Sequence, residues 1–291
     1  MRSISRRGTT VGLALGAAVA VASSCGSPRG ATSRPVPLKV VASVFPLAEV
    51  ARQIGGARVA VTDLTPTGVD PRRLDIRADQ LAVVRRADVM LDVGGGFQPA
   101  VERAATSARS VISLLPALGD GDPRVWLDPI LMERITSMIG DALIRVDPLG
   151  ASEYHRGVRE FTARLGALDI DYRSSLADCA RQDIVTSQEA FRRLTNRYGL
   201  VEHPITGASG LPALAGLVKA KGLTTVFVEP LAPAAAARSL GHQAHLRIEV
   251  LDPIDGLTPA EQARGTSYVS LMTDNLATLR SALACTSGSP T

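Results

Sequence analysis

Charged and amide side chains gather in short segments that follow predicted strands or precede a predicted helix. The segments are GVDPRRLDI (68–76), DPRVWLDP (122–129), TSQEAF (186–191), FVEPL (227–231) and LDPIDGL (251–257). Their carboxylates and amides would offer oxygen ligands to a divalent cation, whereas their guanidinium groups would bind an anion or a carboxylate. We therefore expect these segments to build one binding site, whose chemistry depends on which groups face it.

Short β-branched runs alternate with segments of helical periodicity along the chain. The first set of predicted strands spans 39–44, 58–64, 87–93 and 110–114. The second set spans 183–187, 224–229 and 246–251. This alternation is typical of parallel sheets built from β-α units, in which ligands bind beyond the carboxyl ends of the strands.

Helical patterns separate the two sets of strands and close the chain. The first has an apolar stripe made up of Leu131, Ile135, Met138, Ile139, Ala142 and Leu143. The second spans 148–177, about 45 Å at ~1.5 Å per residue, and has apolar residues at steps of three and four. A last amphipathic pattern over 268–283 predicts a closing helix.

The predicted fold is therefore α/β, with two lobes that are each a mostly parallel sheet flanked by helices, joined by one long spine helix. The expected boundaries are a signal peptide (1–24), a lipid-anchored linker (25–37), an N-terminal lobe (38–146), the spine helix (147–178), a C-terminal lobe (179–285) and a tail (286–291).

The first 24 residues have the pattern of an export signal. Arg2, Arg6 and Arg7 precede an apolar run at 11–21, which is too short to span a bilayer. Cys25 follows small residues as in a bacterial lipobox, so we predict that it is lipidated and anchors the chain to the outer face of the cell membrane. An ordinary cleaved signal peptide is the alternative.

Cys179 and Cys285 are the two cysteines that follow Cys25. In an exported protein they are candidates for a disulfide, which would attach the closing helix to the start of the second lobe. Two free thiols are the alternative, because the sequence does not give the distance between them.

The composition excludes several classes of function. Of the 291 residues 45% are hydrophobic and only 3% aromatic, and the net charge of +4 includes the three arginines of the leader. Few aromatic residues and no basic block argue against a nucleic acid partner. We find no nucleophile elbow and no Cys–His pair, so no enzyme is predicted. Asp128 and Asp255 adjoin Pro129 and Gly256 and are expected to serve turns or helix caps.

Together the polar segments resemble those of the solute-binding lipoproteins of zinc and manganese ABC importers. The resemblance runs from about residue 38 to 285 and includes VASVFPLAEVARQIGG (41–56), the long central helix and RYGL (197–200). It implies two α/β lobes that hold one divalent ion between them with histidines and carboxylates. It also implies delivery of that ion to a membrane permease.

Most ligand positions implied by the resemblance carry other residues here. Arg72 and Arg124 stand where family members have histidine, and Gln188 stands where they have histidine or glutamate. Asp252 is the one carboxylate left at such a position, and it is the predicted metal residue. Secondary candidates in the cleft are Glu229, Asp70, Asp75 and Glu189.

The substitutions leave several interpretations of the cleft. Arginine has no free lone pair and stays protonated, so Arg72 and Arg124 turned inward would exclude zinc or manganese. Turned outward, they would leave a weak site of oxygen ligands. A guanidinium group paired with Asp252 would instead lock the lobes without a ligand, and two convergent guanidinium groups would hold an anion or a metal chelate. The cofactor is therefore zinc or manganese by resemblance, or none.

We predict that the chain is a monomeric solute-binding lipoprotein of a metal-type ABC importer, which captures its ligand between the lobes and delivers it to a permease. The alternatives are a non-transporting accessory or interaction lipoprotein on the cell surface, and a receptor for an anion or a metal chelate.

Overall fold

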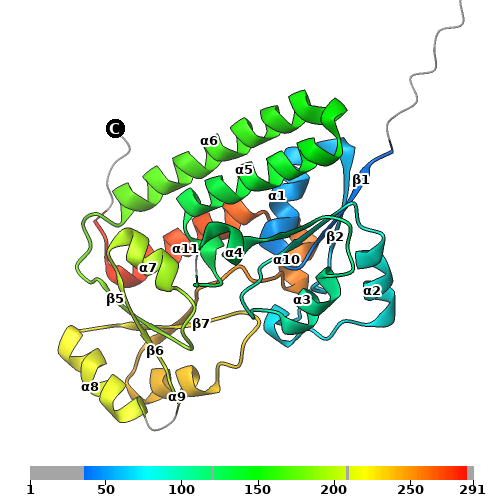
Figure 1. The fold of residues 1–291 in the computed structure, drawn as a ribbon. Helices are drawn as coiled ribbons and strands as arrows, with labels where there is room; N and C mark the ends of the chain where they lie inside the picture. The colour runs from blue at the N-terminus through cyan, green and yellow to red at the C-terminus, as the bar shows by residue number, and fades with distance from the viewer. Residues whose placement is uncertain (1–35, 120, 208–209, 287–291) are drawn as a thin grey trace, which may run out of the picture. The chain divides into compact units, whose positions relative to one another are not determined.

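The computed structural model describes residues 36–119, 121–207 and 210–286 (Figure 1). The predictions on the signal peptide and on lipidation of Cys25 concern residues outside these ranges. No helix in the described ranges is long and apolar enough to cross a membrane.

Two four-stranded parallel sheets form the framework. The first has the order β2-β1-β3-β4 and consists of β1 (Leu38–Ala42), β2 (Val59–Asp63), β3 (Val89–Asp92) and β4 (Val111–Ser113). The second has the order β6-β5-β7-β8 and consists of β5 (Asp183–Thr186), β6 (Val201–Pro204), β7 (Thr225–Val228) and β8 (Arg247–Val250). The predicted α/β class with two sheets is confirmed.

Helices connect the strands of each sheet. Those around the first sheet are α1 (Phe45–Gly55), α2 (Ala78–Arg85), α3 (Pro99–Ala105) and α4 (Leu114–Leu118). Those of the second are α7 (Arg192–Tyr198), α8 (Leu211–Lys221) and α9 (Ala235–Gln243). The chain ends with α10 (Pro259–Arg264) and the predicted closing helix, α11 (Tyr268–Leu283).

Two long antiparallel helices, α5 (Pro129–Val146) and α6 (Ala151–Ser175), connect the two blocks (Figure 1). Asp128 caps α5 by accepting a hydrogen bond from the Ile130 N–H at 2.9 Å. The predicted helix over 148–177 is shorter, because residues 148–150 form a 3₁₀ turn. Gly157 allows α6 to approach α1 closely, since a Cβ there would lie 2.5 Å from the Ile54 carbonyl oxygen.

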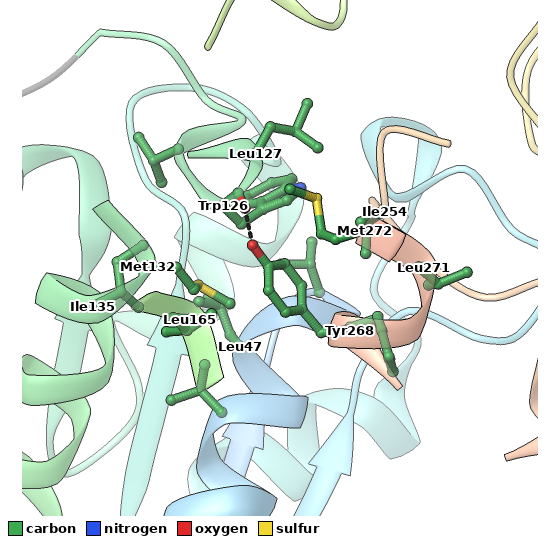
Figure 2. Packing of buried hydrophobic residues seen from close by; sticks show 14 of the residues in the cluster. Leu47, Trp126, Leu127, Met132, Ile135, Leu165, Ile254, Tyr268, Leu271 and Met272 are labelled. Atoms are coloured by element: carbon green, nitrogen blue, oxygen red, sulfur yellow. Dashed lines mark hydrogen bonds between the residues drawn. The ribbon is translucent and has the colours of Figure 1, made fainter. Parts of the chain in front are cut away.

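One hydrophobic core extends under both sheets and fixes the loops that carry the polar segments. It includes Val40 and Leu91 from the first sheet and Ile184 and Phe227 from the second. In Figure 2 the Tyr268 hydroxyl donates a hydrogen bond to the carbonyl oxygen of the fully buried Trp126. Because side chains of both halves interlock here, we regard the loops as rigid supports.

The strand β6 was missed by the sequence analysis. It lies at an edge of the second sheet, and its polar residues Glu202 and His203 interrupt any apolar run. Pro204, which lacks an N–H, is tolerated in this position because an edge strand has one unpaired side.

Candidate functional site

A buried ion pair joins Arg124, which precedes α5, to Asp255, which follows β8. The guanidinium Nε lies 3.0 Å from Oδ1 of Asp255, and Nη2 lies 2.9 Å from Oδ2. Arg124 is 5% exposed and Asp255 4% exposed. This forked geometry is the strongest form of an arginine–carboxylate contact, and it links the first half of the chain to the second.

Charge in this pair is set by two opposing effects. Burial lowers the pKa of Arg124, but the carboxylates of Asp255, Glu229 and Asp122 raise it, and the net shift is upward. Burial raises the pKa of Asp255, while the Arg124 guanidinium opposes that rise. Since a guanidinium does not lose its proton in proteins, we assign the Asp255 carboxylate as ionised in this bidentate contact.

A second chain of contacts runs from Asp70 through Arg72 and Gln188 to Glu229. Asp70 caps a 3₁₀ turn at Pro71–Arg73 and accepts bonds from Nε and Nη2 of Arg72 at 3.0 and 2.9 Å. Nη1 of Arg72 donates to the Gln188 amide oxygen at 3.2 Å. The Gln188 amide nitrogen donates to Oε2 of Glu229 at 2.7 Å. The chain therefore connects the loop after β2 to the ends of β5 and β7.

Asp252 occupies a rigid turn directly after β8. Its backbone N–H donates to the Asn275 side chain at 2.8 Å, and its Oδ1 accepts from the Ile254 N–H at 2.7 Å. Its other carboxylate oxygen, Oδ2, is buried and has no hydrogen-bond partner. Oε1 of Glu229 is in the same condition, and such orphaned acceptors favour a bound proton, water or cation.

These groups enclose a cavity of only about 10 Å³, roughly the space of one water molecule. Burial raises the pKa of Glu229 to about 7 and that of Asp252 to about 8. Two guanidinium groups are balanced by Asp70 and Asp255, so the extra carboxylates are stabilised in the protonated state. The polar walls of the cavity come from Asp70, Arg72, Glu229, Asp252 and Asp255.

The structure brings most of the predicted site residues together. Arg72, Gln188, Glu229, Asp70 and Asp252 lie in or beside the cavity, as described above. Two secondary candidates do not reach it. Asp75 is exposed, and Glu189 is also exposed and contributes only its carbonyl oxygen, which accepts from Nη1 of Arg124 at 3.5 Å.

Asp255 lines the cavity and binds Arg124, but the sequence analysis did not include it among the site residues. Pairing of a guanidinium with Asp252 was one of the interpretations left open, but Arg124 binds Asp255, three residues further on. A turn or cap role does not account for Asp255, since its carboxylate is buried in an ion pair. The Asp-Gly sequence at 255–256 suggested a surface turn, and only the tertiary contact with Arg124 shows otherwise.

The donor set does not fit a tight zinc site. Zinc prefers four ligands drawn from imidazole, thiolate and carboxylate, and the described residues contain no group of three or more such side chains placed to hold a metal. The His203 imidazole does not line this cavity; its Nε2 lies 2.7 Å from Oδ1 of Asp183, near the edge of the second sheet. A divalent ion about 4 Å from a guanidinium would be repelled by roughly 8 kcal/mol at an effective dielectric constant near 20.

The Cys179 and Cys285 side chains are joined as a disulfide, at a sequence separation of 106. The backbone pairs there as well, as an isolated antiparallel bridge. The link attaches the end of α11 to the chain just before β5.

Two parallel sheets with a buried polar site between loops from both halves define a two-lobed solute-binding protein. The profile of the family described as zinc-uptake complex component A, periplasmic (ZnuA), matches residues 40–282. The chain belongs to this family, which is a solute-binding component of transport systems and not an enzyme.

Curated relatives and solved structures agree with this assignment. The high-affinity zinc uptake system protein ZnuA of Bacillus subtilis is 26% identical, over 91% of this chain and 93% of the relative. The zinc-binding lipoprotein AdcA of Streptococcus pneumoniae is 25% identical over 84% of this chain, which spans 55% of that relative's length. The metal-dependent lipoprotein YcdH of Bacillus subtilis superposes with a TM-score of 0.77 at 26% identity, over 84% of this chain and 99% of that one.

Proposed function

We propose that this chain is an exported, lipid-anchored component of a metal ABC importer that contacts a membrane permease and keeps its cleft closed with its own ion pairs. In this role it does not capture bare zinc or manganese with high affinity. It therefore corresponds to an accessory member of its family, anchored through Cys25.

The observation that carries the proposal is the position of the two guanidinium groups. Arg124 binds Asp255 and Arg72 binds Asp70 and Gln188, so both guanidinium groups project into the region between the sheets. Each already has a carboxylate partner. The cavity that Arg72 lines holds about one water molecule, and Arg124 lines a separate cavity of about 280 Å³. The same contacts argue against a receptor for an anion, which would have to displace two intramolecular carboxylates.

Weak capture of a cation is the second candidate, and one observation favours it. Oε1 of Glu229 and Oδ2 of Asp252 are buried without partners on the wall of the same cavity. Once both carboxylates lose their protons, they would offer two oxygen ligands to a divalent ion. This candidate predicts binding that strengthens as the pH rises past the pKa values of about 7 and 8.

Substitution of the two arginines tests the proposal. Isothermal titration calorimetry of the wild type with zinc chloride at neutral pH should give a dissociation constant weaker than about 10 μM, below ~7 kcal/mol of binding free energy. The Arg72→His/Arg124→His variant should bind zinc at least tenfold more tightly, because it gains two imidazole ligands and loses two positive charges. The Arg72→Lys/Arg124→Lys variant, which keeps the charges, should show no gain. Submicromolar binding by the wild type would refute the proposal.

A further inference from the structure

A second and much larger cavity lies outside the cleft. Its volume is about 470 Å³, and it shares no lining residue with the cleft cavity. Its walls come from α1, from the chain after β2, and from α10 with the residues that follow it. The described residues place two carboxylates on these walls, those of Glu49 and Asp63, and one guanidinium group, that of Arg52.

Local structure positions both carboxylates. Asp63 is the last residue of β2, and its Oδ1 accepts a hydrogen bond from the Thr65 N–H at 3.0 Å, which fixes the side chain in a tight turn. Glu49 lies on α1 and accepts from the Gln53 amide at 3.0 Å. Glu49 is 8% exposed, although it belongs to the residue types that are almost never fully buried without a partner.

The opposite wall is fixed to the first by hydrogen bonds. The Gly68 N–H donates to the Leu257 carbonyl oxygen at 2.7 Å, and the Thr67 hydroxyl donates to the Gln262 amide oxygen at 3.4 Å. The residue Thr258 caps α10 and so fixes the helix that carries Gln262. The cavity is therefore a formed pocket between ordered segments.

Arg52 lines the same cavity, but neither carboxylate forms an ion pair with it. Among the described residues, no ion pair joins Glu49 or Asp63 to a lysine, arginine or histidine. Burial raises the pKa of Asp63 to about 7, and the positive charge of Arg52 opposes this only in part. A cationic ligand beside Asp63 would relieve the desolvation that raises the pKa of this carboxyl group.

The size of the cavity decides which kind of cation fits. Calcium and magnesium take six or more oxygen ligands at about 2.0–2.6 Å and zinc takes four ligands, whereas the described residues provide no group of three metal-ligating side chains. A volume of 470 Å³ lies within the range of about 300–1,000 Å³ that holds small organic molecules. Phe45 and Leu257 supply apolar surface for carbon atoms, and the threonines and Gln262 supply hydrogen bonds.

We propose that this pocket binds a small organic cation, a protonated amine or a guanidinium, whose charged group lies between Asp63 and Glu49. The site is distinct from the cleft and does not depend on what the cleft holds. Substitution of Arg72 or Arg124 should leave it unchanged.

Isothermal titration calorimetry of the full mature chain tests the site with 1,4-diaminobutane and 1-amino-4-guanidinobutane as probes. At least one probe should bind, and the neutral 1,4-butanediol should not. The Asp63→Asn variant should bind the probe at least tenfold more weakly, because it removes one negative charge and keeps the acceptor for Thr65. The Gln262→Lys variant should also bind the probe at least tenfold more weakly. Its lysine would place a positive charge on the wall of the pocket, at an exposed helical position, and would compete with the probe. The Glu160→Gln variant removes an exposed carboxylate on α6 and should match the wild type.

The site would be overturned by no binding of either probe at millimolar concentration, by equal binding of the neutral diol, or by tighter binding of calcium chloride than of the amines. Loss of binding in Gln262→Lys is informative even if Asp63→Asn fails to fold, because Gln262 is exposed and lysine favours a helix. Unchanged binding in Gln262→Lys would also contradict the assignment.

Discussion

The Arg124 guanidinium and the Asp255 carboxylate, 131 residues apart in the sequence, face each other in a buried bidentate pair at 2.9–3.0 Å. The pair fastens the loop before α5 to the loop after β8. Relatives are named for zinc, whereas in this chain a guanidinium group fills part of the cleft. The effects expected below on stability, on local opening and on zinc binding follow from the presence of this guanidinium group in the cleft.

Removal of the Asp255 charge should destabilise the fold strongly. The Asp255→Asn variant leaves the Arg124 guanidinium buried without its counter-charge, which costs about 3–5 kcal/mol in comparable buried pairs. Urea unfolding followed by circular dichroism measures the loss. The matched variant Asp79→Asn breaks an exposed pair with Arg77 and should unfold at the wild-type urea midpoint. A midpoint for Asp255→Asn equal to that of Asp79→Asn would contradict a structural role for the buried pair.

The Gln188 amide should hold the two sides of the cleft together. In the Gln188→Leu variant, Nη1 of Arg72 and Oε2 of Glu229 lose the partner that joins them. We expect amide hydrogen exchange in 68–76 and 186–191 to rise about tenfold, equivalent to ~1.4 kcal/mol of local opening. The control Gln243→Leu removes an exposed hydrogen bond to Ser239 on α9. Exchange rates in both segments that match the control would exclude the bridge.

Stability should fall as the pH rises. Burial raises the folded-state pKa of Glu229 to about 7 and that of Asp252 to about 8. The folded state therefore keeps protons that the unfolded chain releases above about pH 4, and the free energy of unfolding declines through this window and levels off above about pH 8. The two shifts together correspond to roughly 5 kcal/mol less stability at about pH 8.5 than at about pH 5.5.

The Asp252→Asn variant should flatten that dependence, because an amide does not titrate. Its control is Asp75→Asn, which changes an exposed carboxylate outside the cavity. Urea unfolding at both pH values gives the two slopes. A slope for Asp252→Asn as steep as that of Asp75→Asn would show that Asp252 is ionised in the folded protein at neutral pH.

The Cys179–Cys285 disulfide should stabilise the mature chain. Because the bond closes a long loop, with 106 residues of sequence separation, the Cys179→Ala/Cys285→Ala variant should lose about 2–4 kcal/mol of unfolding free energy. Intact-mass measurement with and without reductant should show a two-proton difference in the wild type. Alkylation of both thiols without reductant would show that they are free.

The fold could be predicted largely from local patterns. The strand β7, for example, is a run of buried residues, TVFV, and such runs flanked by helical periodicity indicate a parallel sheet. The strand β6 could not be found in this way, because Glu202 and His203 are polar and its stability comes from pairing with β5. Edge strands depend on their neighbours more than on their own residues.

The site was only partly predictable, because the partner of each arginine depends on contacts between segments far apart in the sequence. Arg72, Arg124 and Gln188 stand at recognisable motif positions, so their approach to the cleft could be expected. The partner of Arg124 is decided by the backbone turn at 252–255, in which Ile254 takes a positive φ of 59°. That turn uses one oxygen of Asp252 to accept from Ile254 and presents Asp255 to the guanidinium. No local pattern distinguishes these two aspartates.

A crystal structure of the wild-type protein grown with about 1 mM zinc chloride, with anomalous diffraction recorded at the zinc absorption edge, tests the central claim most directly. We predict no anomalous peak in the cleft and an intact contact between Arg124 and Asp255. A peak within about 2.0–2.2 Å of the Asp252 and Glu229 oxygens, with both guanidinium groups turned away, would contradict the account.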